Sequence, residues 1–199
     1  MAKIIVTGCK GFIGKHLMPA LKEHEVIGVD LDGDESVTGP LDGIIHLAAV
    51  SRVRDAEADR IKCLQTNIIL TAMVLEWKPK WFIYISTCEP PTNVYGYSKR
   101  AAEQYVELTA PKHVIFRLTN VYGQGMQEDK LLPRLRRGEI KTLDASVLPF
   151  EYIHVDDVVR EIKQAITLFD QPAFKPLKMK LSTGIAKTRE ELERVAASY

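Results

Sequence analysis

The amino-acid sequence predicts an α/β protein with a parallel, doubly wound sheet and helices on both faces. Short apolar, β-branched runs alternate with stretches of helical spacing up to residue 119. A glycine-rich turn joins the first run to the first helical stretch. Small, acidic and hydroxyl-bearing residues follow several of the runs, at the carboxyl ends of the expected strands. Ligands bind at these ends in sheets of this class.

The predicted elements follow one another in a regular order. Residues 3–6 (KIIV) have the composition of a buried parallel strand, and residues 15–24 have helical spacing. The later elements repeat this alternation. The expected strands are 25–30, 43–50, 81–86 and 113–119, and the expected helical stretches are roughly 55–76 and 97–109.

After residue 125 the alternation loosens. We expect a helix within 128–140, a strand at 150–155, and helices at 156–169 and 188–198. The Pro- and Lys-rich stretch 170–180 is interpreted as a loop rather than a domain boundary. A chain of 199 residues can bury a proper core, so residues 1–199 are interpreted as one domain.

Composition and charge exclude several classes of function. Apolar residues make up 46% of the chain and the formal net charge is +1, so no bulk attraction to nucleic acid is expected. The first apolar run is too short for a signal-peptide core or a membrane span, which predicts a cytoplasmic protein without membrane contact. Cys9, Cys63 and Cys88 are widely spaced, which favours reduced thiols and no metal site.

The first turn has the pattern of a phosphate-binding loop. Gly8, Gly11 and Gly14 form G-x-x-G-x-x-G between a strand and a helix, with Phe12 and Ile13 inside the motif. Glycines allow a tight turn and a close approach of the backbone to a pyrophosphate, whose charge faces the N–H groups of the helix start. A plain strand-to-helix turn is the alternative. The strand before, the helix after and the acid at the next strand end favour dinucleotide binding.

That acid is Asp30, which ends the second predicted strand. A carboxylate there binds the ribose hydroxyls of an adenosine and repels a 2′-phosphate, so NAD is the predicted cofactor. Lys10, inside the glycine turn, could attract a phosphate, which leaves NADP as the less favoured alternative. The neighbouring acids Asp32, Asp34 and Glu35 are interpreted as solvated loop residues.

A second pattern follows the strand at 81–86. Tyr95 and Lys99 are four residues apart at a helix start and therefore lie on one face. Tyr97 points elsewhere and is expected to pack at the helix entry. The preceding strand ends in hydroxyl-bearing residues, Ser86 and Thr87.

The motifs TGCKGFIG, HLAA, IST, YGYSK and RLTNVYG, in that order, resemble the extended short-chain dehydrogenase/reductase family of nucleotide-sugar epimerases and dehydratases. The match runs over nearly the whole chain. The resemblance implies a Rossmann-type, NAD(P)-binding domain with a C-terminal substrate-binding lobe. Here that lobe would be reduced to roughly residues 124–199.

The resemblance also implies roles for the second pattern. Tyr95 would be the general base, with a pKa lowered by the Lys99 ammonium and by an oxidised nicotinamide. Thr87 would hydrogen-bond the substrate oxygen as hydride leaves the same carbon. Lys99 would also hold the nicotinamide ribose. Ser86 is interpreted as a structural hydroxyl.

Further cofactor contacts follow from HLAA and from the helix after it. Leu47, Ala48 and Ala49 match the strand-end segment whose small residues let the cofactor lie close, and His46 is interpreted as a core residue. Asn67 matches the family asparagine behind the nicotinamide half. Its helix and the Tyr95 helix resemble the family's four-helix homodimer interface. Burial inside a monomer is the alternative.

Three features depart from the family pattern. Only thirteen residues separate Asp30 from Ile44, so the helix and strand usual there are expected to be reduced or absent. Only seven separate Thr87 from Tyr95, where the family has a longer loop over the substrate. Phe150 occupies the position of an arginine that grips a nucleotide diphosphate, which argues against a nucleotide sugar.

The residues after Thr87 narrow the chemistry further. Dehydratases of this family have an aspartic acid where this chain has Cys88, so dehydration is less favoured. Glu89 is either a second acid/base or a solvated loop residue. The leading hypothesis is an NAD-dependent oxidoreductase or epimerase that acts on a sugar or nucleotide-sugar secondary alcohol. The alternative is a non-catalytic dinucleotide-binding or redox-sensing module.

Overall fold

The computed structural model describes residues 1–30, 39–143 and 147–199. Its main feature is a six-stranded sheet of order β2-β1-β3-β4-β5-β8, in which every pair of neighbours is parallel. This confirms the predicted fold class. The strands are β1 (Lys3–Thr7), β2 (Glu25–Val29), β3 (Gly43–His46), β4 (Trp81–Thr87), β5 (His113–Leu118) and β8 (Leu177–Leu181).

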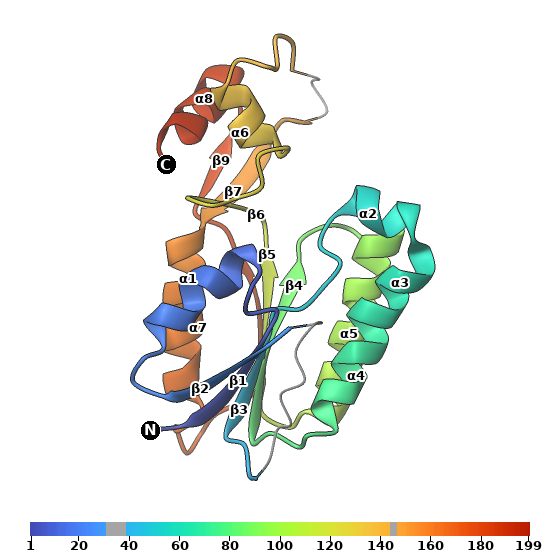
Figure 1. The fold of residues 1–199 in the computed structure, drawn as a ribbon, viewed down its shortest axis with the longest axis vertical. Coiled ribbons are helices and arrows are strands. Elements are labelled where there is room, and N and C mark those ends of the chain that lie inside the picture. Colours follow the sequence, from blue (N-terminus) through green and yellow to red (C-terminus); the bar gives the residue numbers. More distant parts are fainter. Residues whose placement is uncertain (31–38, 144–146) are drawn as a thin grey trace.

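Helices cover both faces of this sheet (Figure 1). One face carries α1 (Phe12–Ala20) and α7 (Val155–Leu168). The other carries α4 (Leu70–Leu75) and α5 (Val94–Thr109). Three short elements lead into α4 on that side: α2 (Val53–Ala58), α3 (Arg60–Leu64) and the π-helical turn η1 (Gln65–Ile69).

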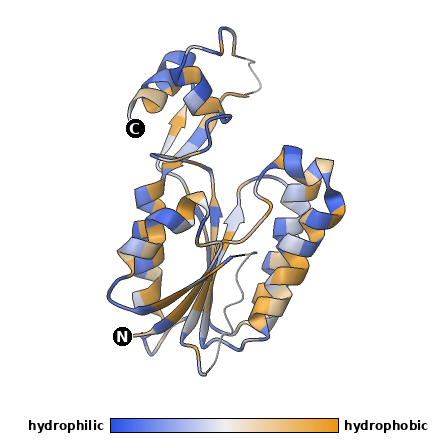
Figure 2. Cartoon of the chain, in the orientation of Figure 1, coloured by the Kyte–Doolittle hydropathy of each residue, from blue (hydrophilic) through white to orange (hydrophobic). Residues whose placement is uncertain are grey.

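Two hydrophobic cores result from the alternation of strand side chains. In β1, Ile4 and Val6 pack toward α1 and α7, whereas Ile5 packs toward α4 and α5. All three are fully buried, as expected for a strand with both faces covered. Figure 2 shows the hydrophobic residues that run through the central strands.

A smaller lobe lies beyond the carboxyl ends of β1, β3 and β4 (Figure 1). Its sheet has the order β6-β7-β9. A third core, which includes Leu132 and Leu192, packs its two helices on that sheet. The elements are β6 (Asn120–Tyr122), α6 (Leu131–Arg136), β7 (Phe150–His154), β9 (Gly184–Ala186) and α8 (Arg189–Ala197).

Several sequence-based expectations need correction. The stretch 170–180 is not only a loop, because β8 begins at Leu177 and pairs with β5. Exposed lysines alternate along this edge strand and hide its strand pattern. The helical stretch 55–76 is broken at Asp59, which caps α3 by accepting the Lys62 N–H at 3.0 Å. Tyr97 is not packed within the chain, since 58% of it is exposed.

Other expectations fall partly outside the described residues. Asp32, Asp34 and Glu35 belong to residues 31–38, which lie outside the described ranges, and residues 39–42 carry neither helix nor strand.

All three cysteines are free thiols. Among the described residues, no helix combines the length and apolar character needed to cross a membrane.

Candidate active site

A cleft of about 1230 Å³ lies between the carboxyl ends of the central strands and the smaller lobe. It opens beside β1 and β3, where the strand order reverses, the expected ligand position in a doubly wound sheet. The described residues contain no group of three acidic, histidine or cysteine side chains placed to hold a metal ion. The cleft wall includes Gly8, Gly11, Phe12, Ile13, Gly14, Asp30, Leu47, Ala48, Ala49, Thr87, Tyr95 and Lys99.

The glycine turn has no room for side chains at two of its positions. Gly8 has a φ of +70°, and a Cβ there would lie 2.7 Å from the Ala48 nitrogen. A Cβ on Gly14 would lie 2.5 Å from the Gly8 carbonyl oxygen. No described side chain caps the start of α1, so its first N–H groups can bind a phosphate. These residues therefore fit a dinucleotide.

Asp30 follows β2 and lies beside this turn. Its Oδ2 accepts a hydrogen bond from the Lys10 backbone N–H at 3.0 Å. The Gly8 N–H donates to the Val29 carbonyl at 2.8 Å. The carboxylate is thus held next to the glycine loop, where the adenosine ribose of a bound dinucleotide would lie.

His46, the last residue of β3, is a buried core residue with 1% exposure. The Thr71 hydroxyl donates to the Asn67 carbonyl, so it accepts from His46 Nε2 at 3.0 Å. Nδ1 then accepts from the Thr7 hydroxyl at 2.7 Å, and Thr7 Oγ1 accepts the Ala48 N–H at 3.3 Å. Burial lowers the pKa of His46 to about 3, so the imidazole is neutral. This chain fixes the strand end that lines the cleft.

Asn67 lies under the cleft rather than in its wall. It is 1% exposed, within η1. Its Oδ1 accepts the Val50 N–H at 2.8 Å, and its Nδ2 donates to the Val50 carbonyl at 3.1 Å and to Ser98 Oγ at 2.8 Å. Asn67 therefore ties the segment after β3 to α5, and it does not line the cleft that would hold the cofactor.

The loop between β4 and α5 places Thr87 and Tyr95 together. Thr87 Oγ1 accepts the Glu89 N–H at 3.1 Å, so its own proton can be donated to Tyr95 or to a bound substrate. Asn93 caps α5 by accepting the Gly96 N–H at 2.8 Å. Its side-chain amide also donates to Glu89 at 2.7 Å, so this carboxylate is held in place rather than fully solvated.

The pKa values of the Tyr95 and Lys99 side chains are both shifted by burial. Burial raises the pKa of Tyr95, although a hydrogen bond with Thr87 lowers it in part. Burial lowers the pKa of Lys99 to about 7, against the opposing effect of the Glu103 charge. The expected low pKa of Tyr95 is therefore not produced by the protein groups alone, because desolvation outweighs them.

An ion-pair network behind Thr87 was not predicted from the sequence. Glu103 on α5 is 2% exposed at its side chain and pairs with Arg117, whose Nε lies 3.0 Å away. Arg100 donates both to Glu103 at 2.6 Å and to the Thr87 carbonyl at 2.9 Å. The available signal was the spacing of three from Arg100 to Glu103, which puts both on one helical face.

A second unpredicted network crosses the cleft. Arg52, in the segment after β3, donates to Asp129 at 2.6 and 2.7 Å and to Gln127 at 2.8 Å. His16 on α1 contacts the Gln124 carbonyl at 2.9 Å. The contacts of Arg52 and His16 hold the segment 124–129, which leads into the lobe. Their partners are more than 70 residues apart in sequence, so no local pattern indicates them.

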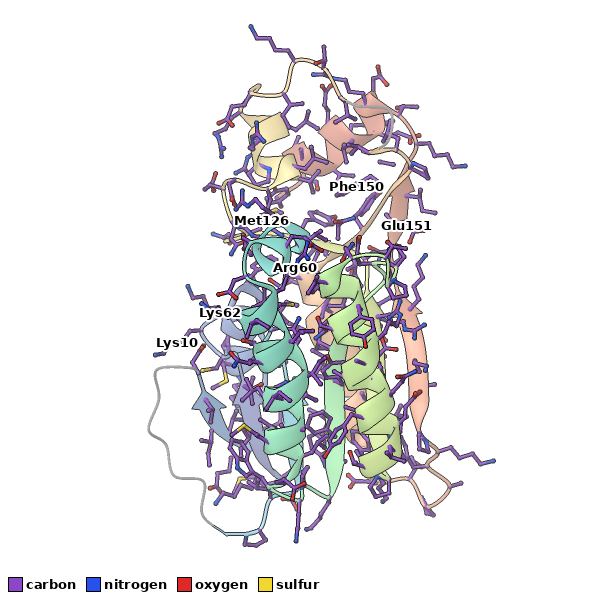
Figure 3. All side chains as sticks on the ribbon, turned by 90° about the vertical axis from the view of Figure 1, so that its right-hand side faces the viewer. Lys10, Arg60, Lys62, Met126, Phe150 and Glu151 are labelled. Carbon is purple, nitrogen blue, oxygen red and sulfur yellow. The ribbon has the colours of Figure 1, made fainter. Side chains whose placement is uncertain are left out.

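Phe150 lines the cleft from the lobe side, together with Met126. Figure 3 shows both where the lobe meets the main sheet, with Lys10 farther down beside the glycine turn. The neighbouring Glu151 is paired with Lys180. An aromatic ring therefore occupies the place where an arginine was the family expectation.

Comparison with known proteins identifies relatives over most of the chain. The model of the NAD dependent epimerase/dehydratase family matches residues 4–175. A UDP-2-acetamido-2,6-beta-L-arabino-hexul-4-ose reductase of Pseudomonas aeruginosa is 28% identical, over 87% of this chain and 54% of the relative. A dTDP-D-glucose 4,6-dehydratase of Dictyostelium discoideum is 25% identical, over 79% and 54%. The chain thus spans about half the length of these curated relatives.

Solved structures share the fold. MoeE5 in complex with UDP-glucose and NAD superposes with a TM-score of 0.82 at 22% identity, covering 98% of this chain and 81% of that one. A UDP-glucose 4-epimerase of Thermotoga maritima with UDP-glucose has a TM-score of 0.78 at 24% identity, with coverage of 98% and 81%. At these identities the likeness supports the arrangement of the sheet and its helices.

Proposed function

The chain belongs to the NAD-dependent epimerase/dehydratase family, and from this premise we propose that it binds NAD and oxidises a sugar-like secondary alcohol by hydride transfer. One observation carries the proposal. Thr87, Tyr95 and Lys99 line the same cleft as the glycine turn, so a proton acceptor and a dinucleotide loop face one volume. Hydride transfer needs both.

Each residue has a distinct role in the proposed reaction. In the proposed reaction the Thr87 hydroxyl donates a hydrogen bond to the substrate oxygen, and Tyr95 takes the proton of the substrate hydroxyl. Lys99 donates to the nicotinamide ribose and supplies positive charge beside the phenol. When bound, NAD would supply the hydride acceptor, in an epimerase also the returning hydride, and a positive ring that lowers the pKa of Tyr95.

We assign substrate binding to the lobe side of the cleft, within residues 124–199. The relatives named above act on or bind nucleotide sugars, which makes a sugar or nucleotide sugar the proposed class. Phe150 offers a ring face rather than a guanidinium. Glu89, held by Asn93, is placed to act as a second acid or base next to Thr87.

A direct test uses the purified chain, NAD and a panel of UDP-, dTDP- and ADP-sugars together with simpler sugar alcohols. We expect calorimetry to detect NAD binding, and NMR to detect conversion of at least one compound only when NAD is present. Failure to bind NAD would contradict the proposal. Conversion that does not require a nicotinamide cofactor would contradict it as well.

Replacing Asp30 with serine is expected to weaken the preference for NAD over NADP. The change removes the carboxylate that binds ribose hydroxyls and repels a 2′-phosphate, so the NAD-to-NADP affinity ratio should fall by about tenfold or more, since a hydrogen bond to a charged group contributes about 1.5 kcal/mol or more. Titration with both cofactors measures the ratio. Glu25→Gln, at the other end of β2 and 55% exposed at its side chain, is the matched control. An unchanged ratio in Asp30→Ser would refute the assignment.

We also propose that α4 and α5 form a homodimer interface. Four large apolar side chains of α5 and of the helical segment formed by η1 and α4 are exposed. Clustered exposed apolar residues mark association surfaces, and a two-fold axis would bury the same residues on both copies. They are Ile69 (54%), Met73 (61%), Tyr97 (58%) and Leu108 (83%).

Met73→Glu is therefore expected to convert a dimer into a monomer, because two carboxylates would meet near the axis without partners. Sedimentation velocity measures the change in mass. Leu168→Glu, on α7 across the sheet and 39% exposed, is the control that should stay dimeric. A wild-type chain that remains monomeric at high concentration would disprove the interface.

A further inference from the structure

The Lys99 ammonium lies over the face of the Tyr84 ring. Its Nζ is 4.2 Å from the ring centroid. Lys99 is 3% exposed and Tyr84 is fully buried, so neither contact partner is solvated. Lys99 comes from α5 and Tyr84 from the middle of β4, so the contact joins the catalytic helix to the sheet. Within the described chain, the ring is the one specific contact found for this ammonium.

The Tyr84 hydroxyl does not explain why this residue is a tyrosine. Its oxygen is buried and has no hydrogen-bond partner among the described residues. Burial also raises the pKa of Tyr84 well above its usual value, so the phenol stays neutral. The Thr71 hydroxyl lowers that pKa in part, but the Tyr84 hydroxyl forms no hydrogen bond of normal geometry with the described residues, so the ring face is the part of Tyr84 that contacts Lys99.

We propose that Tyr84 is a positioning residue for Lys99. The face of the Tyr84 ring keeps the Lys99 ammonium charged and directs it toward the cofactor ribose. The inference rests on the role of Lys99 in the proposed function. A cation is attracted to the negative face of an aromatic ring, and the attraction grows when both are shielded from water. Because both groups are buried here, the attraction between the ammonium and the ring is expected to lie at the upper end of its usual range.

Burial and the titratable groups around Lys99 have opposing effects on its pKa. Burial disfavours the charged form and the Glu103 carboxylate favours it, with a pKa of about 7 as the result. The His46 ring stacks on Tyr84 with centroids 5.9 Å apart and is neutral, so it adds no repulsion. A contact of moderate strength therefore decides whether Lys99 is charged near neutral pH. The surrounding groups are Glu103 and Tyr95 on α5, Cys63 on α3, and His46 on β3.

The test compares Tyr84→Leu, which removes the ring, with Tyr84→Phe, which removes only the hydroxyl. The protein is labelled with ¹³C-lysine, and the Lys99 signal is assigned by its absence in Lys99→Arg. The Cε shift of Lys99 is then followed with pH by two-dimensional NMR. The titration needs neither cofactor nor substrate, so its outcome is independent of the proposed activity.

We expect the Lys99 midpoint to be nearly the same in wild type and Tyr84→Phe. In Tyr84→Leu it should fall by about 0.5 to 1.5 units, the shift that corresponds to a desolvated cation–π contact. A leucine variant that titrates like wild type would overturn the inference, and so would a phenylalanine variant that shifts as far as leucine. If Tyr84→Leu does not fold, Tyr84→Met fills the space without a ring, and the same criteria apply.

Discussion

Tyr95→Phe is expected to lose turnover by a factor of about 10² to 10⁴ and to bind NAD with unchanged affinity. The substitution removes the proton acceptor and keeps the ring, and general-base catalysis contributes a factor of this size. Binding should persist because the glycine turn and Asp30 do not depend on the phenol. Single-turnover formation of reduced nicotinamide and calorimetric titration with NAD measure the two quantities separately.

The matched control is Tyr105→Phe, on the same helix but outside the cleft wall. It loses the same hydroxyl and should turn over like wild type. This pair of variants also separates the enzyme from the alternative, a module that only binds a dinucleotide. A Tyr95→Phe protein as active as wild type would exclude the assigned base.

Glu103→Gln is expected to lower the free energy of unfolding by about 3 kcal/mol, the cost of breaking a buried ion pair from one side. The Glu103 carboxylate is paired with Arg117 and Arg100 and accepts a hydrogen bond from the Ser86 hydroxyl, so a neutral amide leaves two guanidinium groups without their counter-charge. Ser86 is thus the structural hydroxyl that the sequence predicted. Urea denaturation of both proteins measures the loss.

The pH dependence of this loss has a definite sign. Burial raises the pKa of Glu103, but hydrogen bonds from Arg117 and Ser86 and the charge of Arg100 outweigh burial and bring it below the usual value of 4.5. The stabilisation is therefore fully present above pH 4.5 and disappears as the pH falls through the folded-state pKa. The difference between wild type and Glu103→Gln should shrink below pH 4.5.

Glu107→Gln is the control for Glu103→Gln. Glu107 is one turn farther along α5, is 38% exposed at its side chain and pairs with Lys178 at 2.5 Å. Exposed ion pairs contribute little, so we expect a loss below about 1 kcal/mol. Equal losses from the two substitutions would show that the buried network behind Thr87 adds no special stability.

The features that the sequence predicted correctly have local causes. Strands β1 to β5 of the main sheet follow from apolar runs, and the side-by-side placement of Tyr95 and Lys99 follows from the pitch of a helix. The tight turn at Gly8 follows from residues that are consecutive in the chain. Motif order also indicated the family, which the match over residues 4–175 shows.

Other features depend on residues that are distant in sequence. Strand β8 exists because β5 offers it an edge, although its own lysine-rich sequence resembles a loop. Arg52 contacts Asp129, 77 residues later in the sequence, because the segment that leads into the lobe lies beside the segment after β3.

The charge states of the cleft side chains also depend on residues that are distant in sequence. By itself, the sequence determined which ionisable groups share the Tyr95 helix, because helical spacing is local. Only the tertiary structure decided that burial shifts the pKa of Tyr95 upward and that of Lys99 downward, and that Lys99 lies on the ring of Tyr84. Desolvation depends on every element that excludes water from a side chain, and no short stretch of sequence contains that information.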